Sequence, residues 1–226
     1  MRFSFKAAAA FALLASATAA PATIVDPADD FLSTYTGPPN GDVDILSGDV
    51  SFDGTSFFLN AMMGDTIGTT PGTLFVWGIN RGSGTPRLTF GSPSVGAGIL
   101  FDAVIVMFPD GTLRVVTIPL AGAPTISMIA GGTTIAGDSL SATVPLALLG
   151  SMGFAPEDYV FNFWSRTRVN PALDGTNAEI ADFLGSPQQA RAVPEPATWL
   201  TLLLGFGIIG TVMRKARKVV LLQQAA

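Results

Sequence analysis

Short runs of alternating polar and apolar residues, punctuated by glycine and proline, occupy the middle of the chain. Asp42 to Leu46 alternates as a half-buried strand does. Val50 to Phe52, the dipeptide Asp53-Gly54 and then Thr55 to Met63 predict a hairpin with a tight turn. Thr73 to Asn80 is rich in aromatic and β-branched residues and is bounded by turn signals, which predicts a central strand.

A second group of predicted strands follows a linker of glycine, serine and proline. Ile99 to Phe108 is almost wholly apolar, turns at Pro109-Asp110-Gly111 and returns as Thr112 to Pro119, which is the pattern of a hairpin. Further short strands are predicted at 126–130, 133–135, 139–144 and 160–165. Many short strands with frequent turns predict an all-β fold, an antiparallel β-sandwich.

Four segments carry weaker patterns. Pro145 to Gly150 predicts one helical turn, and Asn177 to Leu184 predicts a short helix. Phe31 to Tyr35 predicts an edge strand within an extended leader. Gly185 to Val193 has the composition of a flexible stalk.

Both ends of the chain have export patterns. Arg2 and Lys6 precede an apolar stretch, and Ala17-Thr18-Ala19 is the small-x-small site of a secretory signal peptide, with cleavage expected after Ala19. At the other end, 197–213 forms an uncharged apolar run of 17 residues, at the short end of what crosses a bilayer as a helix. The basic residues that follow it are expected to stay on the cytoplasmic side.

The residues around this apolar run resemble a known sorting signal. Pro194-Glu195-Pro196, two further residues, Trp199, the apolar run and then a basic cluster are similar to the PEP-CTERM signal of Gram-negative bacteria, in its Trp-containing subclass; the basic residues are Arg214, Lys215, Arg217 and Lys218. The resemblance implies recognition by an exosortase, a membrane-embedded processing enzyme, followed by delivery to the cell surface or the extracellular space. An uncleaved membrane anchor is the alternative, but it gives no reason for Pro-Glu-Pro followed by Trp.

These patterns divide the chain into six segments. They are a signal peptide (1–19), an extended leader (20–41), the β-sandwich (42–168), a stalk (169–193), the sorting signal with a single transmembrane helix (194–218) and a cytoplasmic tail (219–226).

Composition excludes several classes of function. Six arginines, no lysine and 17 acidic residues lie between Asp26 and Glu195, a formal net charge of −11 that repels nucleic acid. The chain has no cysteine and no histidine, which excludes Ser-His-Asp and Cys-His catalysis and the usual zinc sites. Carboxylate chemistry and oxygen-ligated calcium stay open.

Aromatic and arginine side chains are the candidates for contact with glycans. In the predicted strand at 160–165, Phe161 and Phe163 share one face while Trp164 lies on the other. Aromatic rings stack on sugars, and arginine pairs with acidic ones, so the predicted glycan-binding set is Trp164, Tyr159, Trp77, Arg166 and Arg168. The alternative for both tryptophans is a place in the sandwich core.

The central region is also similar in pattern to β-sandwich domains of other exported bacterial proteins whose shape is that of carbohydrate-binding modules. The similarity rests on the stretches at 71–78, 101–104, 109–111 and 154–159. It supports the fold class and carries over no binding residue.

Carboxylates give two further hypotheses. Asp42 and Asp44, followed by Asp49 and Asp53, are candidate calcium ligands, with solubilising surface charge as the alternative; Asp26, Asp29 and Asp30 in the leader are a weaker version of the same set. A glycan-degrading enzyme needs two carboxylates across a cleft, and the candidates are Asp102, Glu157, Asp158 and Glu179, whose spacing selects no pair.

Taken together, the sequence predicts an exported, surface-sorted protein with a structural or adhesive role in an exopolysaccharide layer or biofilm, and not an enzyme. Its expected partners are the exosortase, the membrane before processing, and exopolysaccharide, with no nucleic acid. A calcium-stabilised carbohydrate-binding module is the main alternative, and a glycan-degrading enzyme is a third. No cofactor other than calcium is expected.

Overall fold

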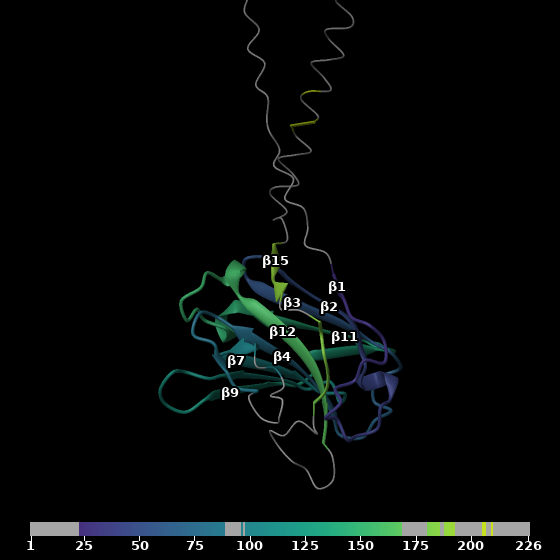
Figure 1. Ribbon diagram of the computed structural model, residues 1–226. Helices are drawn as coiled ribbons and strands as arrows, with labels where there is room; N and C mark the ends of the chain where they lie inside the picture. The colour runs from purple at the N-terminus through teal and green to yellow at the C-terminus, as the bar shows by residue number, and fades with distance from the viewer. Residues whose placement is uncertain are drawn as a thin grey trace, which may run out of the picture.

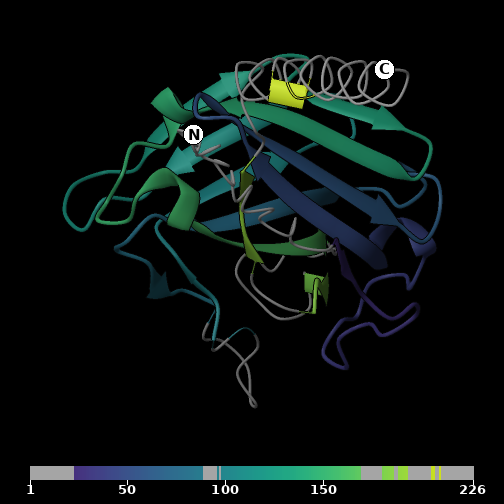
Figure 2. The ribbon, with the colours of Figure 1, turned by 90° about the horizontal axis from the view of Figure 1, so that it is seen from above.

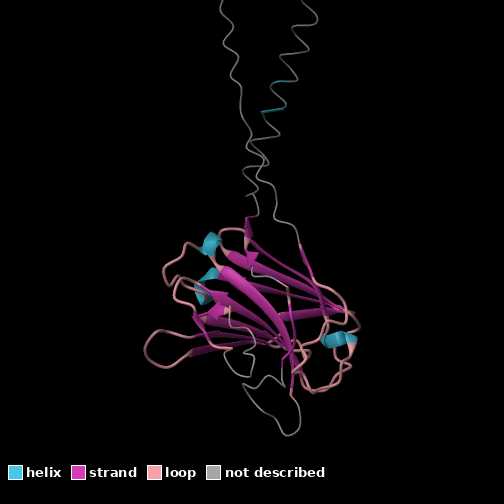
Figure 3. Ribbon diagram, in the orientation of Figure 1, coloured by secondary structure: helices cyan, strands magenta, loops and turns pink. Residues whose placement is uncertain are grey.

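A computed structural model gives the architecture of the chain. It describes residues 23–88, 96, 98–168, 180–185, 188–192, 205, 206 and 209. Strands are the main regular elements of the domain, joined by loops and accompanied by a few short helical turns (Figure 3). The predicted all-β class is confirmed. Within the described residues, no helix is long and apolar enough to cross a membrane. The predicted signal peptide and nearly all of the apolar run at 197–213 lie outside the described residues.

The first sheet has six strands in the order β1-β2-β3-β11-β10, with β15 also paired to β2. Their bounds are β1 Ile24–Val25, β2 Ile45–Phe52, β3 Ser56–Met63, β10 Thr133–Ala136, β11 Ser139–Pro145 and β15 Arg191–Ala192. All pairings are antiparallel except that of β15 with β2. The first and last strands of the described domain therefore both lie against β2.

The second sheet has seven strands in the order β13-β12-β4-β7-β8-β9, with β14 also paired to β12. Their bounds are β4 Thr73–Asn80, β7 Ala103–Met107, β8 Leu113–Thr117, β9 Thr125–Ile129, β12 Val160–Thr167, β13 Ile180–Phe183 and β14 Gln188–Gln189. A separate small ribbon joins β5 Thr85–Pro86 to β6 Leu100–Phe101, and the 3-10 turns are η1 Gly41–Val43, η2 Leu146–Leu148 and η3 Pro156–Asp158.

The two sheets pack face to face and enclose one apolar core, as the predicted β-sandwich requires (Figure 1 and Figure 2). Strand alternation supplies this core, because every second residue of β3, and of β2 from Gly48 to Phe52, is buried. On the other side, Trp77 of β4 meets Phe163 of β12 with ring centroids 4.5 Å apart. Seven of the eight residues of β4 are buried, so the predicted central strand is confirmed. A core of this size holds the fold without disulfides.

The structure corrects several local predictions. The segment predicted as a helix at Asn177 to Leu184 contains the strand β13, which pairs with β12; so short a helix is marginal alone and a sheet edge was open to it. Phe31 to Tyr35 is a turn closed by Tyr35 N–H on Leu32 O, whereas the leader's strand is β1. Asp42 and Val43 lie in the 3-10 turn η1, and the predicted stalk contributes β14 and β15.

A buried ion pair fastens three loops at one end of the sandwich. Arg81 Nε lies 2.7 Å from Asp102 Oδ1, and the two side chains are 4% and 1% exposed. Asp102 also accepts the backbone N–H of Ser83, and Arg81 donates to the carbonyl oxygen of Gly150. Because both charges are desolvated, each depends on the other.

Replacing Arg81 with methionine is expected to destabilise the fold strongly, because it leaves the Asp102 carboxylate buried without a cation. The free energy of unfolding, measured by urea denaturation, should fall by about 3–5 kcal/mol. Arg87→Met is the matched control, since Arg87 binds only a carbonyl oxygen among its contacts here and should cost about 1 kcal/mol. Equal losses for the two variants would contradict a special role for the pair.

Candidate functional site

A groove crosses the outer face of the seven-stranded sheet. Trp164 of β12 pairs with Val76 of β4, and Val76 pairs on its other side with Val106 of β7. Val106 pairs in turn with Arg114 of β8. Since directly paired residues point to the same face, these four side chains form one row across the sheet. A cavity of about 410 Å³ lies along this row.

Glycine at position 78 makes room for the indole ring of Trp164. A Cβ at Gly78 would lie 2.6 Å from Cζ3 of Trp164, so any larger residue would displace the ring. The ring also contacts Phe101, at 5.6 Å between centroids, and Phe183, at 6.1 Å. Trp164 is only 2% exposed and forms a wall of the groove, so it takes neither of the two places weighed from the sequence, an open platform or the core between the sheets.

Three arginines border the groove. Arg114 lies on β8, Arg166 lies on β12, and Arg168 follows the end of β12. Arg168 is exposed and the other two are half-buried. The chain has only six arginines and no lysine between residues 20 and 193, so half of the basic side chains of that region line one groove. Positive charge between apolar walls favours an anionic ligand.

Two nitrogen atoms of residues that line the groove have no hydrogen-bond partner within the described part of the chain. They are Nε1 of Trp164 and Nε of Arg114, and both are buried. The Arg114 guanidinium lies over the ring of Phe108, 5.3 Å from its centroid. A buried donor without an acceptor costs about 1–3 kcal/mol, and Nε1 of Trp77 in the core is in the same state.

The structure divides the predicted glycan-binding residues into two groups. Trp164, Arg166 and Arg168 line the groove. Trp77 and Tyr159 are fully buried in the core, where the Tyr159 hydroxyl donates to the carbonyl oxygen of Leu149 at 2.9 Å. These two side chains cannot reach a glycan in this structure. Sequence reasoning missed Arg114, because only the pairing of β8 with β7 places it in the row.

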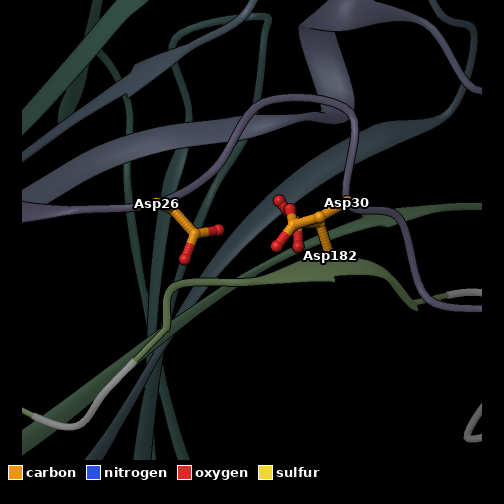
Figure 4. Close-up of side chains that lie close together, drawn as sticks. All are labelled: Asp26, Asp30 and Asp182. Atoms are coloured by element: carbon orange, nitrogen blue, oxygen red, sulfur yellow. The ribbon is translucent and has the colours of Figure 1, made fainter.

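A second candidate site lies where the N-terminal segment meets β13. Asp26, Asp30 and Asp182 each bring a carboxylate oxygen within 4.8 Å of the other two (Figure 4). Asp26 and Asp182 are 5% and 2% exposed, whereas Asp30 is open to solvent. Backbone N–H groups hold the two buried carboxylates, that of Gly185 on Asp26 Oδ1 at 2.7 Å and that of Ile45 on Asp182 Oδ2 at 2.8 Å.

Burial and mutual repulsion perturb the acidity of this cluster. Desolvation, followed by the charges of Asp30 and Asp44, raises the pKa of Asp26 to about 6 despite its hydrogen bond from Gly185. Desolvation, followed by the charges of Asp26 and Asp30, raises the pKa of Asp182 to about 7. Desolvation also raises the pKa of Asp44. The folded protein therefore holds protons here that an unfolded chain would release.

The carboxylates predicted as calcium ligands are dispersed. Asp42 is buried and accepts the N–H and hydroxyl of a threonine at position 70, and Asp44 accepts the N–H of Asp29. Asp49 lies within β2, and Asp53 closes the turn before β3. Among the described residues, the group able to hold one ion contains none of these four.

The carboxylates weighed for catalysis also occupy separate places. Asp102 is paired with Arg81, while Glu157 and Asp158 lie on the exposed turn η3. Glu179 is outside the described residues. None of the three described carboxylates lines the groove.

The acidic cluster predicts a pH dependence of stability. Because the folded-state pKa of Asp182 lies above its ordinary value of 3.8, this carboxyl favours folding while protonated and opposes it once ionised. In buffer with a chelator, the free energy of unfolding should fall by roughly 3–5 kcal/mol between about pH 4.5 and pH 8 from Asp182 and its buried neighbour Asp26, at about 1.4 kcal/mol per unit of raised pKa.

Urea denaturation across this pH range measures the effect. Asp182→Asn removes the titrating group and should flatten the fall, whereas Asp158→Asn, on an exposed turn, should leave the slope unchanged. The slopes are compared, so a constant loss of stability in either variant does not matter. A slope in Asp182→Asn as steep as in the native chain would contradict the assignment.

No curated protein and no solved structure matches this chain. A family model does match its C-terminal end. The residues predicted for sorting, Pro194, Glu195, Pro196, Trp199, Arg214, Lys215, Arg217 and Lys218, lie within the matched span and outside the described residues. The match confirms the predicted resemblance: residues 192–218 are a PEP-CTERM protein-sorting motif, and the β-sandwich that precedes it is the cargo of an exosortase-sorted protein.

Proposed function

We propose that this protein is a structural or adhesive component of an extracellular polysaccharide layer, such as that of a biofilm, and that it contacts acidic polysaccharide through the groove beside β12. The sorting motif supplies the address, since it directs an exported chain to an exosortase and from there to the cell surface or the extracellular space. The groove supplies the contact.

The concentration of arginine in the groove is the observation that carries this proposal. The domain is strongly acidic, yet Arg114, Arg166 and Arg168 gather around one apolar-walled cavity. An arginine fork binds the carboxylate of a uronic acid with two parallel hydrogen bonds. The acidic surface elsewhere repels the same polymer, which confines contact to the groove.

A carbohydrate-binding module with one definite glycan is the second candidate. The cavity of about 410 Å³ favours it, because that volume falls in the range of small-ligand pockets. Binding to one oligosaccharide with the others silent would select this candidate, and graded binding to many acidic polymers would select the matrix role.

A non-catalytic role forms part of the proposal. Hydrolysis of a glycosidic bond needs two carboxyl groups about 5–10 Å apart across the bound sugar. The described residues that line the groove include no carboxylate, and Asp102 is already bound by Arg81. Both observations support binding without turnover.

Processing at the sorting motif predicts a shortened mature protein. Mass spectrometry of the protein from its own cells should find that the apolar run and the basic cluster Arg214 to Lys218 have been removed. Replacing Pro194 and Glu195 with alanine should block recognition and leave the chain intact through Ala226. An intact C-terminus in the native protein would reduce the motif to a plain anchor.

Binding through the groove predicts a loss of glycan affinity in arginine variants. On an array of acidic and neutral polysaccharides, the native protein should bind acidic polymers in a salt-sensitive way. Arg114→Gln and Arg166→Gln should each weaken binding by about tenfold or more, because a hydrogen bond between charged groups is lost.

Arg87→Gln is the matched control, because Arg87 does not line the groove. It should bind as the native protein does. No binding to any polysaccharide, or equal losses in Arg87→Gln and the groove variants, would refute the proposed contact.

A further inference from the structure

The cluster of Asp26, Asp30 and Asp182 has the dimensions of a cation site. One carboxylate oxygen from each residue lies within 4.8 Å of the other two. Calcium binds oxygen at 2.3–2.6 Å, so two ligands on opposite sides of one ion lie about 4.6–5.2 Å apart. A single calcium ion can therefore touch all three oxygens with little movement of the side chains. Magnesium, with opposite ligands about 4.0–4.2 Å apart, requires a tighter cage.

The second observation is an oxygen without a partner. Asp26 is 5% exposed, and its Oδ2 is buried with no hydrogen-bond partner within the described residues. Its other oxygen is already held by the N–H of Gly185. The carboxylate is oriented toward Asp30 and Asp182 (Figure 4). A buried carboxylate oxygen close to two further carboxylates is unfavourable unless a proton or a cation neutralises the charge.

The backbone holds this group of acids in place from two remote segments. Asp26 donates its N–H to Leu46 O, directly after β1, and Leu32 donates its N–H to Ala181 O, next to Asp182. The N-terminal segment is thus fastened on both sides of Asp30. The main chain therefore holds the backbones of the three acidic residues close together.

No described arginine neutralises the cluster. The ion pair found among the described residues is that of Arg81 with Asp102, at another part of the fold. The charges that act on Asp26 and Asp182 are those of other aspartates, and they raise the pKa of both. A cation removes this repulsion, and the solvent-open side of Asp30 gives it a path of entry.

We propose that Asp26, Asp30 and Asp182 bind one divalent cation, with calcium preferred, and that the ion clamps the N-terminal segment to β13. Hard carboxylate oxygens suit calcium, and water completes its six to eight ligands at the exposed side. Extracellular modules bind calcium at about 10⁻⁴–10⁻³ M, so a site of this class would fill where calcium is millimolar. The clamp joins the segment after the predicted signal peptide to the segment before the sorting motif. It shares no residue with the groove, so the two proposals fail separately.

Thermal unfolding of the full chain in mild detergent tests the site. At about pH 7.5, calcium at roughly ten times its Kd should raise Tm by about 3–6 °C over the value with a chelator, since the ion binds only the folded state. Magnesium at the same concentration should give a smaller shift. Titration calorimetry should find one calcium ion per chain.

Single substitutions locate the ion. Asp30→Asn should abolish the calcium shift while the chain still folds, because Asp30 is exposed, and Asp26→Asn should do the same from the buried side. Asp49→Asn, in the set expected from the sequence, should keep the full shift. Equal Tm in calcium and chelator, a full shift in Asp30→Asn, or a lost shift in Asp49→Asn would each overturn the proposal. A magnesium shift as large as that of calcium would overturn the preference for calcium.

Discussion

The pairing of β12 with β4 is the interaction on which the rest of the structure depends. Its register turns Phe161 and Phe163 inward against Trp77 and leaves Trp164 and Arg166 on the outer face. A slip of one residue would exchange these two sets, so that the core would lose its aromatic rings and the groove its wall. The other edge of β12 binds β13, so the same register also sets the place of the acidic cluster. The core, the groove and the acidic cluster therefore all depend on the register of β12.

Local patterns predicted most of the strands because alternation and turn residues act over a few positions. Thr73 to Asn80 forms a central strand as expected, since a run of aromatic and branched residues fits only a strand buried on both faces. Such local patterns do not predict which residues meet when they lie far apart in the sequence. Nothing near Asp182 in the sequence indicates that it meets Asp26, and Ile180 to Phe183 joined a sheet edge where its local pattern favoured a helix. For the same reason the weaker of the two calcium hypotheses named Asp26 and Asp30 but not Asp182, which the fold brings to them from a distant part of the chain.

Charge is distributed unevenly over the domain. An acidic, lysine-free surface keeps an exported chain soluble and repels anionic polymers, while three arginines make one groove an exception. The acids that gather at the N-terminal segment repel each other in the folded state, and the proposed cation would relieve that repulsion. The sorting motif begins at residue 192, the last residue of β15, which pairs with β2. The motif therefore starts where the folded domain ends.

The groove beside β12 can be tested directly through the two tryptophans of the β-sandwich, Trp77 and Trp164. Trp164 lines the groove and Trp77 fills the core, and the indole N–H of each is buried without a described partner. Nuclear magnetic resonance of the labelled protein, titrated with an acidic oligosaccharide, follows both indole signals at once. We expect the Trp164 signal to shift in a saturable way while that of Trp77 stays in place. A stationary Trp164 signal at saturation, or a shift confined to Trp77, would contradict the account.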